Sequence, residues 1–313
     1  MVDQVIAHYY IDAKIGEGQS AVVYKGHDIR LDRTVAIKVF KEKDPHGSMV
    51  WGRMLREARI ASALNHPNIC AVLDIGEEQD INYIVLEFVE GKTLRSALES
   101  GPLPIKNCLI CAMQIAEAMA YANRAGILHL DLKSSNIMVT PASRVKVIDF
   151  GLARIASQGI AKWTSTSGSS ALEMGVAGTL PYMAPELLHG DKPTTQAGVW
   201  SLGVILFEML TGQLPFCGRT PFELGMEIML GNVSQLPANI SVGLRAIVQR
   251  CLARNMEYRY TSADEVFNHL NSEYIEFEVK AILAGRRFPK NGGHVRASLT
   301  SVLMWLSVLF FGY

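Results

Sequence analysis

The stretch of sequence that decides the fold is His129-Leu130-Asp131-Leu132-Lys133-Ser134-Ser135-Asn136, which Asp149-Phe150-Gly151 follows. From Asp131 to Asp149 it gathers two carboxylates, an ammonium group and an amide within 19 residues. One carboxylate can take or orient a hydroxyl proton, the ammonium group can neutralise developing phosphate charge, and the amide and second carboxylate can hold a metal ion. The stretch therefore indicates phosphoryl transfer from a magnesium-bound nucleotide to a hydroxyl.

The composition indicates a folded protein with a sizeable core. Of the 313 residues, 49% are hydrophobic and 19% are charged, which suits two domains or one large bilobal domain. The formal net charge is zero, which argues against a dedicated nucleic-acid-binding surface. The five cysteines have no framework spacing, which suits a reducing cytosol. Cys108 and Cys111 are expected on one helix face rather than in a zinc site, because no second ligand pair follows.

The periodicity of apolar residues divides the chain into a strand-rich part and a helical part. Strands are expected at 10–15, 21–25, 34–40, 70–75 and 83–89. Helices are expected at 51–64, 93–99, 105–124, 196–211, 220–230, 241–253 and 262–271. A strand-rich unit thus precedes a larger helical one, with the join near Gly91, which predicts an α+β fold. The long loop 156–178 is rich in Ser, Gly and Thr, and its length favours a functional role.

Two further motifs lie in the strand-rich part. Gly16-Glu17-Gly18-Gln19-Ser20-Ala21-Val22-Val23 places glycines between two strands, where the backbone can approach phosphate oxygens without a Cβ clash. Glycine hairpins are common, so this motif alone is a weak indication. Lys38 lies in an apolar strand and could simply face solvent. If Glu57 of the next expected helix pairs with it, the lysine would be fixed to reach nucleotide phosphates.

Taken together, the motifs resemble those of protein kinases, in the same order along the chain. Ala184-Pro185-Glu186 completes the set, and the segment 83–91 resembles the gatekeeper and hinge of bacterial members. The resemblance covers roughly residues 9–271 and is to a Ser/Thr protein kinase. It implies a bilobal α+β fold with an N-lobe at 9–90 and a C-lobe at 91–271.

The resemblance also implies ATP and Mg²⁺ as cofactors, and protein substrates with Ser or Thr acceptors, including the chain itself. It assigns the site as follows: Gly16, Gly18 and Ala21 over the phosphates; Val23 and Ala36 beside adenine; Lys38 paired with Glu57; Leu86 as gatekeeper; the backbone of Glu87 and Val89 at the adenine edge; Asp131 as catalytic base; Lys133 at the γ-phosphate; Asn136 and Asp149 as Mg²⁺ ligands. It further implies that Glu186 pairs with Arg259 and that Thr179 lies near Asp131.

Two residues depart from the family pattern. Leu130 stands where the catalytic loop usually carries arginine, a cation that a phosphate on the activation loop neutralises. Because leucine has no such charge, we hypothesise that activity does not strictly require phosphorylation at residues 164–167. Gly198 stands where an aspartate usually accepts backbone N–H bonds from the catalytic loop, bonds worth about 1.5–3 kcal/mol.

Two alternatives to an active protein kinase remain. The first, which these departures motivate, is a nucleotide-binding pseudokinase scaffold with weak or no transfer. The second is a small-molecule kinase of the same fold, which Ala184-Pro185-Glu186 and the long preceding loop disfavour.

The C-terminal residues predict a membrane anchor. Residues 297–313 carry no charge and as a helix would span about 26 Å, slightly less than a hydrocarbon core of about 30 Å. The preceding linker, 272–296, is basic, which would keep the kinase domain on the cytoplasmic side of the inner membrane. The alternative is a helix docked on the protein or a partner. The N-terminus does not resemble a signal peptide, and a homodimer is possible by family analogy.

Overall fold

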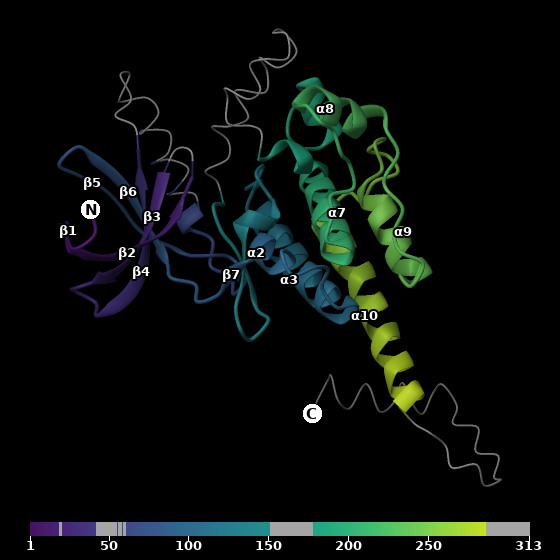
Figure 1. The fold of residues 1–313 in the computed structure, drawn as a ribbon, viewed down its shortest axis with the longest axis horizontal. Helices are drawn as coiled ribbons and strands as arrows, with labels where there is room; N and C mark the ends of the chain where they lie inside the picture. Colours follow the sequence, from purple (N-terminus) through teal and green to yellow (C-terminus); the bar gives the residue numbers. More distant parts are fainter. Residues whose placement is uncertain (19–20, 42–54, 56–57, 59–60, 151–177, 286–313) are drawn as a thin grey trace. The chain divides into compact units, whose positions relative to one another are not determined.

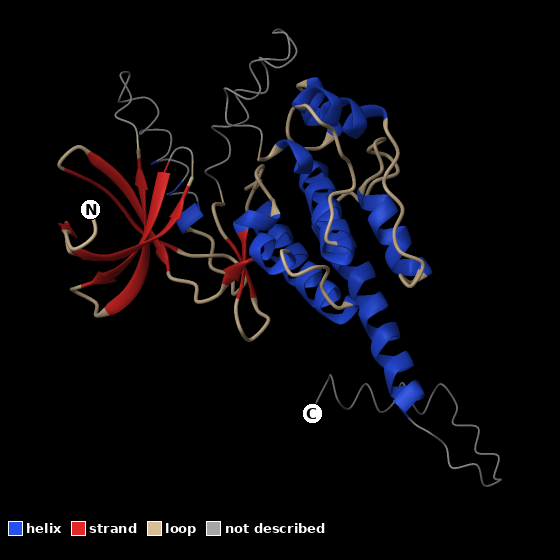
Figure 2. Ribbon diagram, in the orientation of Figure 1, coloured by secondary structure: helices blue, strands red, loops and turns tan. Residues whose placement is uncertain are grey.

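The computed structural model describes residues 1–18, 21–41, 55, 58, 61–150 and 178–285 (Figure 1). Of the predicted features, Glu57, Gly151, residues 164–167 and the anchor 297–313 therefore lie outside the described residues. Residues 1–275 form one compact unit. Within it, strands dominate the N-terminal part and helices the C-terminal part (Figure 2), so the predicted α+β class and bilobal order are confirmed.

The N-terminal sheet is antiparallel, in the order β1-β2-β3-β4-β6-β5. Its strands are β1 (Val5–Ile6), β2 (Tyr9–Glu17), β3 (Ala21–Asp28), β4 (Arg33–Phe40), β5 (Val72–Glu78) and β6 (Ile81–Glu87). The alternation of side chains along β4 gives the sheet two faces. Val35, Ile37 and Val39 are buried in one apolar cluster, while Ala36 packs with Leu86 in a second. Lys38 has the same parity as Ala36 and so faces the second cluster.

A second, small sheet follows in the order β7-β8-β9. Its strands are β7 (Lys92–Thr93), β8 (Ile137–Val139) and β9 (Val145–Val147), and all three pair antiparallel. The short helix η1 (Ser134–Asn136) leads directly into β8. The β8–β9 hairpin therefore carries the two polar segments that flank it, around residues 136 and 149, to one end of the sheet.

The C-terminal part is built on helix α7 (Thr195–Thr211), most of whose side chains are buried. It packs against α3 (Ile105–Arg124) and α9 (Val242–Cys251). A Cβ at Gly203 would lie only 2.5 Å from Cys251 Cβ, so the glycine permits close approach of α7 and α9. The other helices are α2 (Leu94–Leu98), η2 (Leu180–Tyr182), α6 (Pro185–His189), α8 (Pro221–Leu230) and α10 (Ala263–Gly285).

Helix α10 differs from the sequence expectation. The pattern predicted a helix ending at residue 271 and a linker from 272, yet α10 continues to Gly285. The first half of the expected linker is therefore helical. None of the helices among the described residues is both long and apolar enough to cross a membrane.

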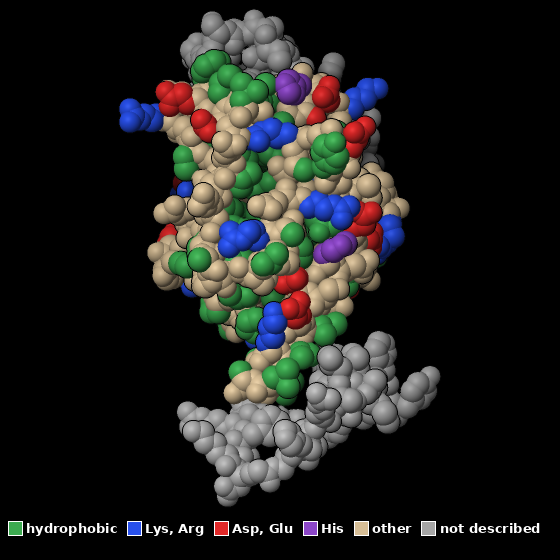
Figure 3. Space-filling view, turned by 90° about the vertical axis from the view of Figure 1, so that its right-hand side faces the viewer, with side chains coloured by type: hydrophobic (Ala, Val, Ile, Leu, Met, Phe, Trp, Pro, Cys, Tyr) green, Lys and Arg blue, Asp and Glu red, His purple; other side chains and the backbone are tan. Residues whose placement is uncertain are grey.

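Charged residues of both signs lie on the face of the molecule that Figure 3 shows. On the face shown in Figure 3, basic and acidic side chains are interspersed among apolar ones. This arrangement agrees with the balanced composition, in which 30 Lys and Arg residues offset 30 Asp and Glu residues.

Candidate active site

His129 fixes the start of the catalytic loop. Its side chain is buried, and its Nε2 lies 3.0 Å from the carbonyl oxygen of Ile148. Burial lowers the pKa of His129, which favours the neutral ring. In that state Nε2–H donates to Ile148 O, and Nδ1 accepts the backbone N–H of Asp131 at 3.3 Å. One histidine thus ties the loop to the chain that leads to Asp149.

Asp131 lies at the centre of a hydrogen-bonded cluster. Thr179 Oγ1 donates to Asp131 Oδ1 at 2.7 Å, and Lys133 Nζ lies 2.9 Å from the carboxylate. Lys133 Nζ also donates to Thr179 Oγ1 at 2.9 Å. Asn136 Nδ2 donates to both Asp131 Oδ2 and the Asp131 carbonyl, each at 2.9 Å. The structure therefore brings the predicted catalytic residues together with Thr179.

Asn136 and Asp149 flank the β8–β9 hairpin. The Ile148 N–H donates to the Asn136 carbonyl at 2.9 Å, which places the residue before Asp149 beside Asn136. The Asn136 amide nitrogen is committed to Asp131, so its oxygen Oδ1 is the atom that can bind a cation. An amide oxygen and a carboxylate are ligands that Mg²⁺ prefers, so the donor set fits this metal.

Lys38 contacts Asp149 directly. Its Nζ lies 2.8 Å from Asp149 Oδ1, and both side chains are mostly shielded from solvent. Burial by itself would raise the pKa of Asp149, but the Lys38 ammonium, together with Lys133, holds it below its usual value. The carboxylate is therefore ionised, as a metal ligand requires. The predicted partner of Lys38, Glu57, lies outside the described residues.

The predicted adenine-binding residues gather around β4 and β6. Ala36 pairs with Leu86 across the two strands, and both belong to one apolar cluster that Val89 joins. The Glu87 N–H already donates to Ala71 O at 2.9 Å, so an adenine edge would meet Glu87 through its carbonyl. The Glu87 carboxylate instead accepts a bond from Lys146 at 2.8 Å.

The predicted phosphate-binding residues lie in the β2–β3 hairpin. Gly16 pairs with Val23, and the Gly18 N–H donates to the Ala21 carbonyl at 2.8 Å. Val23 in turn pairs with Lys38 of β4. The hairpin is thus in register with the strand that carries the lysine.

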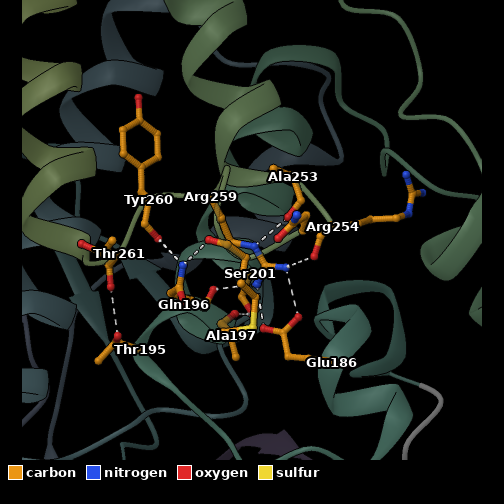
Figure 4. A network of polar contacts seen from close by, with 12 residues as sticks. Glu186, Thr195, Gln196, Ala197, Ser201, Ala253, Arg254, Arg259, Tyr260 and Thr261 are labelled. Carbon is orange, nitrogen blue, oxygen red and sulfur yellow. Dashed lines mark hydrogen bonds and ion pairs between the residues drawn. The ribbon is translucent and has the colours of Figure 1, made fainter.

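The predicted Glu186–Arg259 pair is present and buried. Arg259 Nη1 and Nη2 lie 2.7 and 3.0 Å from the two carboxylate oxygens of Glu186 (Figure 4). Arg259 also donates to the carbonyls of Ala253, Gln196 and Arg254. Its guanidinium lies over the Trp200 ring, 5.1 Å from the centroid. The pair therefore joins α6, α7 and the segment before α10.

The two departures from the family pattern meet in one small pocket. Leu130 has φ of 57°, in the left-handed region, and lines the pocket together with Gly198. A Cβ at Gly198 would lie 2.4 Å from Met119 Cε. The remaining lining residues are Leu132, Thr179, Tyr182, Met183, Leu187, Ala197 and Ser201. The junction of loop and helix is therefore mainly apolar at this point.

Sequence reasoning missed a buried polar group nearby. Ser134, Tyr182 and Glu208 hydrogen-bond to one another between the catalytic loop and α7. A signal existed, because Glu208 interrupts an otherwise apolar run in α7, and carboxylates are rarely buried without partners. Ser134 and Tyr182 gave no comparable signal, since neither residue type is unusual where it stands.

The two-part fold, the cluster around Asp131 and the Lys38–Asp149 contact define the catalytic domain of a protein kinase. The model of the protein kinase domain family matches residues 9–272, and the chain belongs to this family. Serine/threonine-protein kinase PknB of Mycobacterium leprae is 38% identical over 266 residues, which cover 82% of this chain and 42% of that protein.

Other bacterial relatives agree with this placement. Serine/threonine-protein kinase PrkC of Bacillus subtilis is 34% identical over 267 residues, covering 84% of this chain and 40% of that protein. The probable serine/threonine-protein kinase SCO3848 of Streptomyces coelicolor is 37% identical over 267 residues, covering 82% and 38%. The chain is thus of the bacterial serine/threonine kinase type, and it spans about two fifths of the length of these relatives.

Proposed function

We propose that the protein transfers the γ-phosphate of Mg-ATP to serine and threonine hydroxyls of protein substrates, including its own. The observation that carries the proposal is the contact between Thr179 and Asp131. A hydroxyl there lies 2.7 Å from a carboxylate oxygen and 2.9 Å from an ammonium group. The hydroxyl of a substrate would need the same two partners. The carboxylate of Asp131 would take its proton, and the ammonium group of Lys133 would neutralise the phosphate that it attacks.

The residues divide the work by charge. Asp131 accepts the proton of the acceptor hydroxyl, and Lys133 neutralises charge that develops on the transferred phosphate. Lys38 would contact the phosphates of the nucleotide, and Asn136 and Asp149 would hold Mg²⁺. When bound, the metal neutralises phosphate charge and orients the phosphoryl group. The hydrogen bond from Asn136 keeps the Asp131 carboxylate oriented between these groups.

The test is transfer of labelled phosphate from ATP to the protein itself and to a generic basic protein. Asp131→Asn should lower the transfer rate by about 10²–10⁴-fold, because it removes the general base. Nucleotide binding should persist in this variant, since Asp131 does not bind the nucleotide. Incorporation by the unaltered protein no greater than that of Asp131→Asn, with nucleotide still bound, would establish the pseudokinase alternative, which Leu130 and Gly198 favour.

We also propose that residues 297–313 attach the protein to the inner membrane, with the kinase domain in the cytoplasm. The support is the uncharged C-terminal sequence and the basic stretch before it. Association into a homodimer is a separate proposal, which sedimentation of the protein at several concentrations would test.

A further inference from the structure

Three oxygen-bearing side chains meet in the buried space between the catalytic loop and α7. Ser134 Oγ lies 2.8 Å from the Tyr182 hydroxyl and 3.1 Å from Glu208 Oε1. The Tyr182 hydroxyl lies 2.8 Å from Glu208 Oε2. The exposed fractions are 0% for Ser134, 2% for Tyr182 and 8% for Glu208. The three groups come from η1, η2 and α7, so the contacts join three elements.

The number of hydrogens in this group decides its protonation state. Three oxygen–oxygen contacts need three hydrogens, whereas the two hydroxyls supply only two. A carboxylate has none to give, so an ionised Glu208 would leave one contact between bare lone pairs. A protonated Glu208 supplies the third hydrogen and satisfies every contact.

The surroundings of Glu208 agree with this count. Burial raises the pKa of Glu208, and this effect exceeds the lowering by the Tyr182 and Ser134 hydrogen bonds and by Arg95 of α2. Burial likewise raises the pKa of the Tyr182 hydroxyl, which therefore stays neutral.

The position of the group connects it to Asp131. Ser134 follows Lys133 in the chain, and the Tyr182 N–H donates to the Thr179 carbonyl at 3.0 Å. Lys133 and Thr179 are the two side chains that hold Asp131 Oδ1. Lys133 is thus connected to Glu208 through the neighbouring Ser134, and Thr179 is connected to the same glutamate through Tyr182.

We propose that Ser134, Tyr182 and a protonated Glu208 form a positioning triad that holds the catalytic loop on helix α7 and sets the orientation of Asp131. Glu208 lies ten residues after Gly198 in α7. At Gly198 itself the helix has no side chain that could hold the catalytic loop. The catalytic part of this inference rests on the proposed kinase function. The structural part, a neutral glutamate tethering the loop, does not.

The kinetic test compares Ser134→Ala, Tyr182→Phe and Glu208→Gln. The first two each remove one hydroxyl and should lower kcat about tenfold, with the KM for ATP changed less than about twofold, because no nucleotide contact is lost. Glutamine can donate and accept as protonated glutamate does, so Glu208→Gln should retain kcat within about twofold. Ser234→Ala is the matched control, since it also removes a serine hydroxyl bonded at 2.9 Å, here to the Pro215 carbonyl.

Two outcomes would overturn the triad. Unchanged kcat in both Ser134→Ala and Tyr182→Phe would remove the positioning role. A loss in Glu208→Gln as large as that in Ser134→Ala would show that Glu208 acts as a carboxylate.

A readout independent of catalysis separates this inference from the proposed function. Amide hydrogen exchange at 129–136 should be faster in Ser134→Ala and Tyr182→Phe than in Ser234→Ala, while exchange within α3 stays the same. Infrared difference spectra of the unaltered protein against Glu208→Gln should show a protonated carboxyl band at neutral pH. If the protein transfers no phosphate, these two results still decide the triad, and their absence overturns it whatever the activity.

Discussion

The absence of a side chain at Gly198 affects both the catalytic loop and the packing of Met119, and stability measurements can test the packing effect. The site lacks a carboxylate toward the catalytic loop, and Met119 Cε occupies the space that a side chain would need. Because the clash is with the far end of a flexible side chain that can move, Gly198→Asp alone should destabilise the protein by about 1 kcal/mol, the low end of the overpacking range. In a Met119→Ala background the same substitution should cost less than in the unaltered protein, and denaturant unfolding of the four species measures the coupling. Strictly additive effects would contradict the close contact.

The Lys38–Asp149 contact predicts a specific pH dependence of stability. In the unaltered protein the pKa of Asp149 is lowered, so the stability it contributes is present above the unfolded carboxyl value, about 3.9, and declines as pH falls below it. In Lys38→Met, burial would dominate and raise the pKa of Asp149. That variant should then lose stability as pH rises from about 4, so the difference between the two proteins should widen toward neutral pH. The midpoints of urea unfolding of both proteins between pH 4 and pH 7 measure this difference in stability. A difference that stays constant over this range would contradict the prediction.

Some of these side-chain relations could be predicted and others could not. Local motifs were enough to nominate Asp131, Lys133, Asn136 and Asp149, because their spacing follows from one loop and one hairpin. The Lys38–Asp149 contact joins residues 111 apart in sequence, and Ser134 and Glu208 are 74 apart. No short pattern encodes such pairs, since they depend on how the lobes and helices fold together.

At the scale of elements, a buried ion pair between Glu186 and Arg259 joins α6 to the segment before α10. Arg259 is fully buried and Glu186 nearly so, and removing one partner leaves a buried charge uncompensated. Arg259→Leu should therefore cost about 3–5 kcal/mol of stability. Asp264→Asn is a fitting control, because its partner Arg124 lies at a similar 2.7 Å but both side chains are mostly exposed. Thermal unfolding should show a drop of several degrees for the first change and little for the second; equal shifts would contradict the role of burial.

The elements themselves were largely predictable, and the exceptions have physical reasons. The expected helix 196–211 corresponds to α7 (Thr195–Thr211), which ends where Gly212 adopts a φ of 73°. Helix α10 was expected to end at 271, because the basic residues and glycines of 272–296 indicated a linker. Helix-forming residues such as Glu, Lys and Ala nonetheless continue it, and Lys280 pairs with Glu276 one turn earlier.

The activation segment provides a test of the Leu130 hypothesis. Leu130 lines a mainly apolar pocket, and none of the described residues that line it is a cation. Replacing Thr164, Ser165, Thr166 and Ser167 with alanine should lower activity by less than about tenfold, or roughly 1.4 kcal/mol of barrier. In a Leu130→Arg background the same replacements should cost more, because the added cation would lack a phosphate partner. Phosphate transfer to a generic protein measures the loss of activity in both backgrounds. A larger loss in the protein with Leu130 than in the Leu130→Arg variant would refute the hypothesis.

For the protein as a whole, the open question is how the kinase domain is held in the cell. If residues 297–313 form a membrane anchor, a charge near the middle should oppose insertion, while one at the edge should reach the interface. Leu306→Lys should cost about 2.5–3.5 kcal/mol and move the protein from the membrane to the soluble fraction, whereas Ser298→Lys should leave it bound. Fractionation of lysates without detergent, after a high-salt wash, measures the difference. Should the unaltered chain remain soluble and monomeric, the anchor proposal is wrong, and docking of the uncharged segment on the protein itself replaces it.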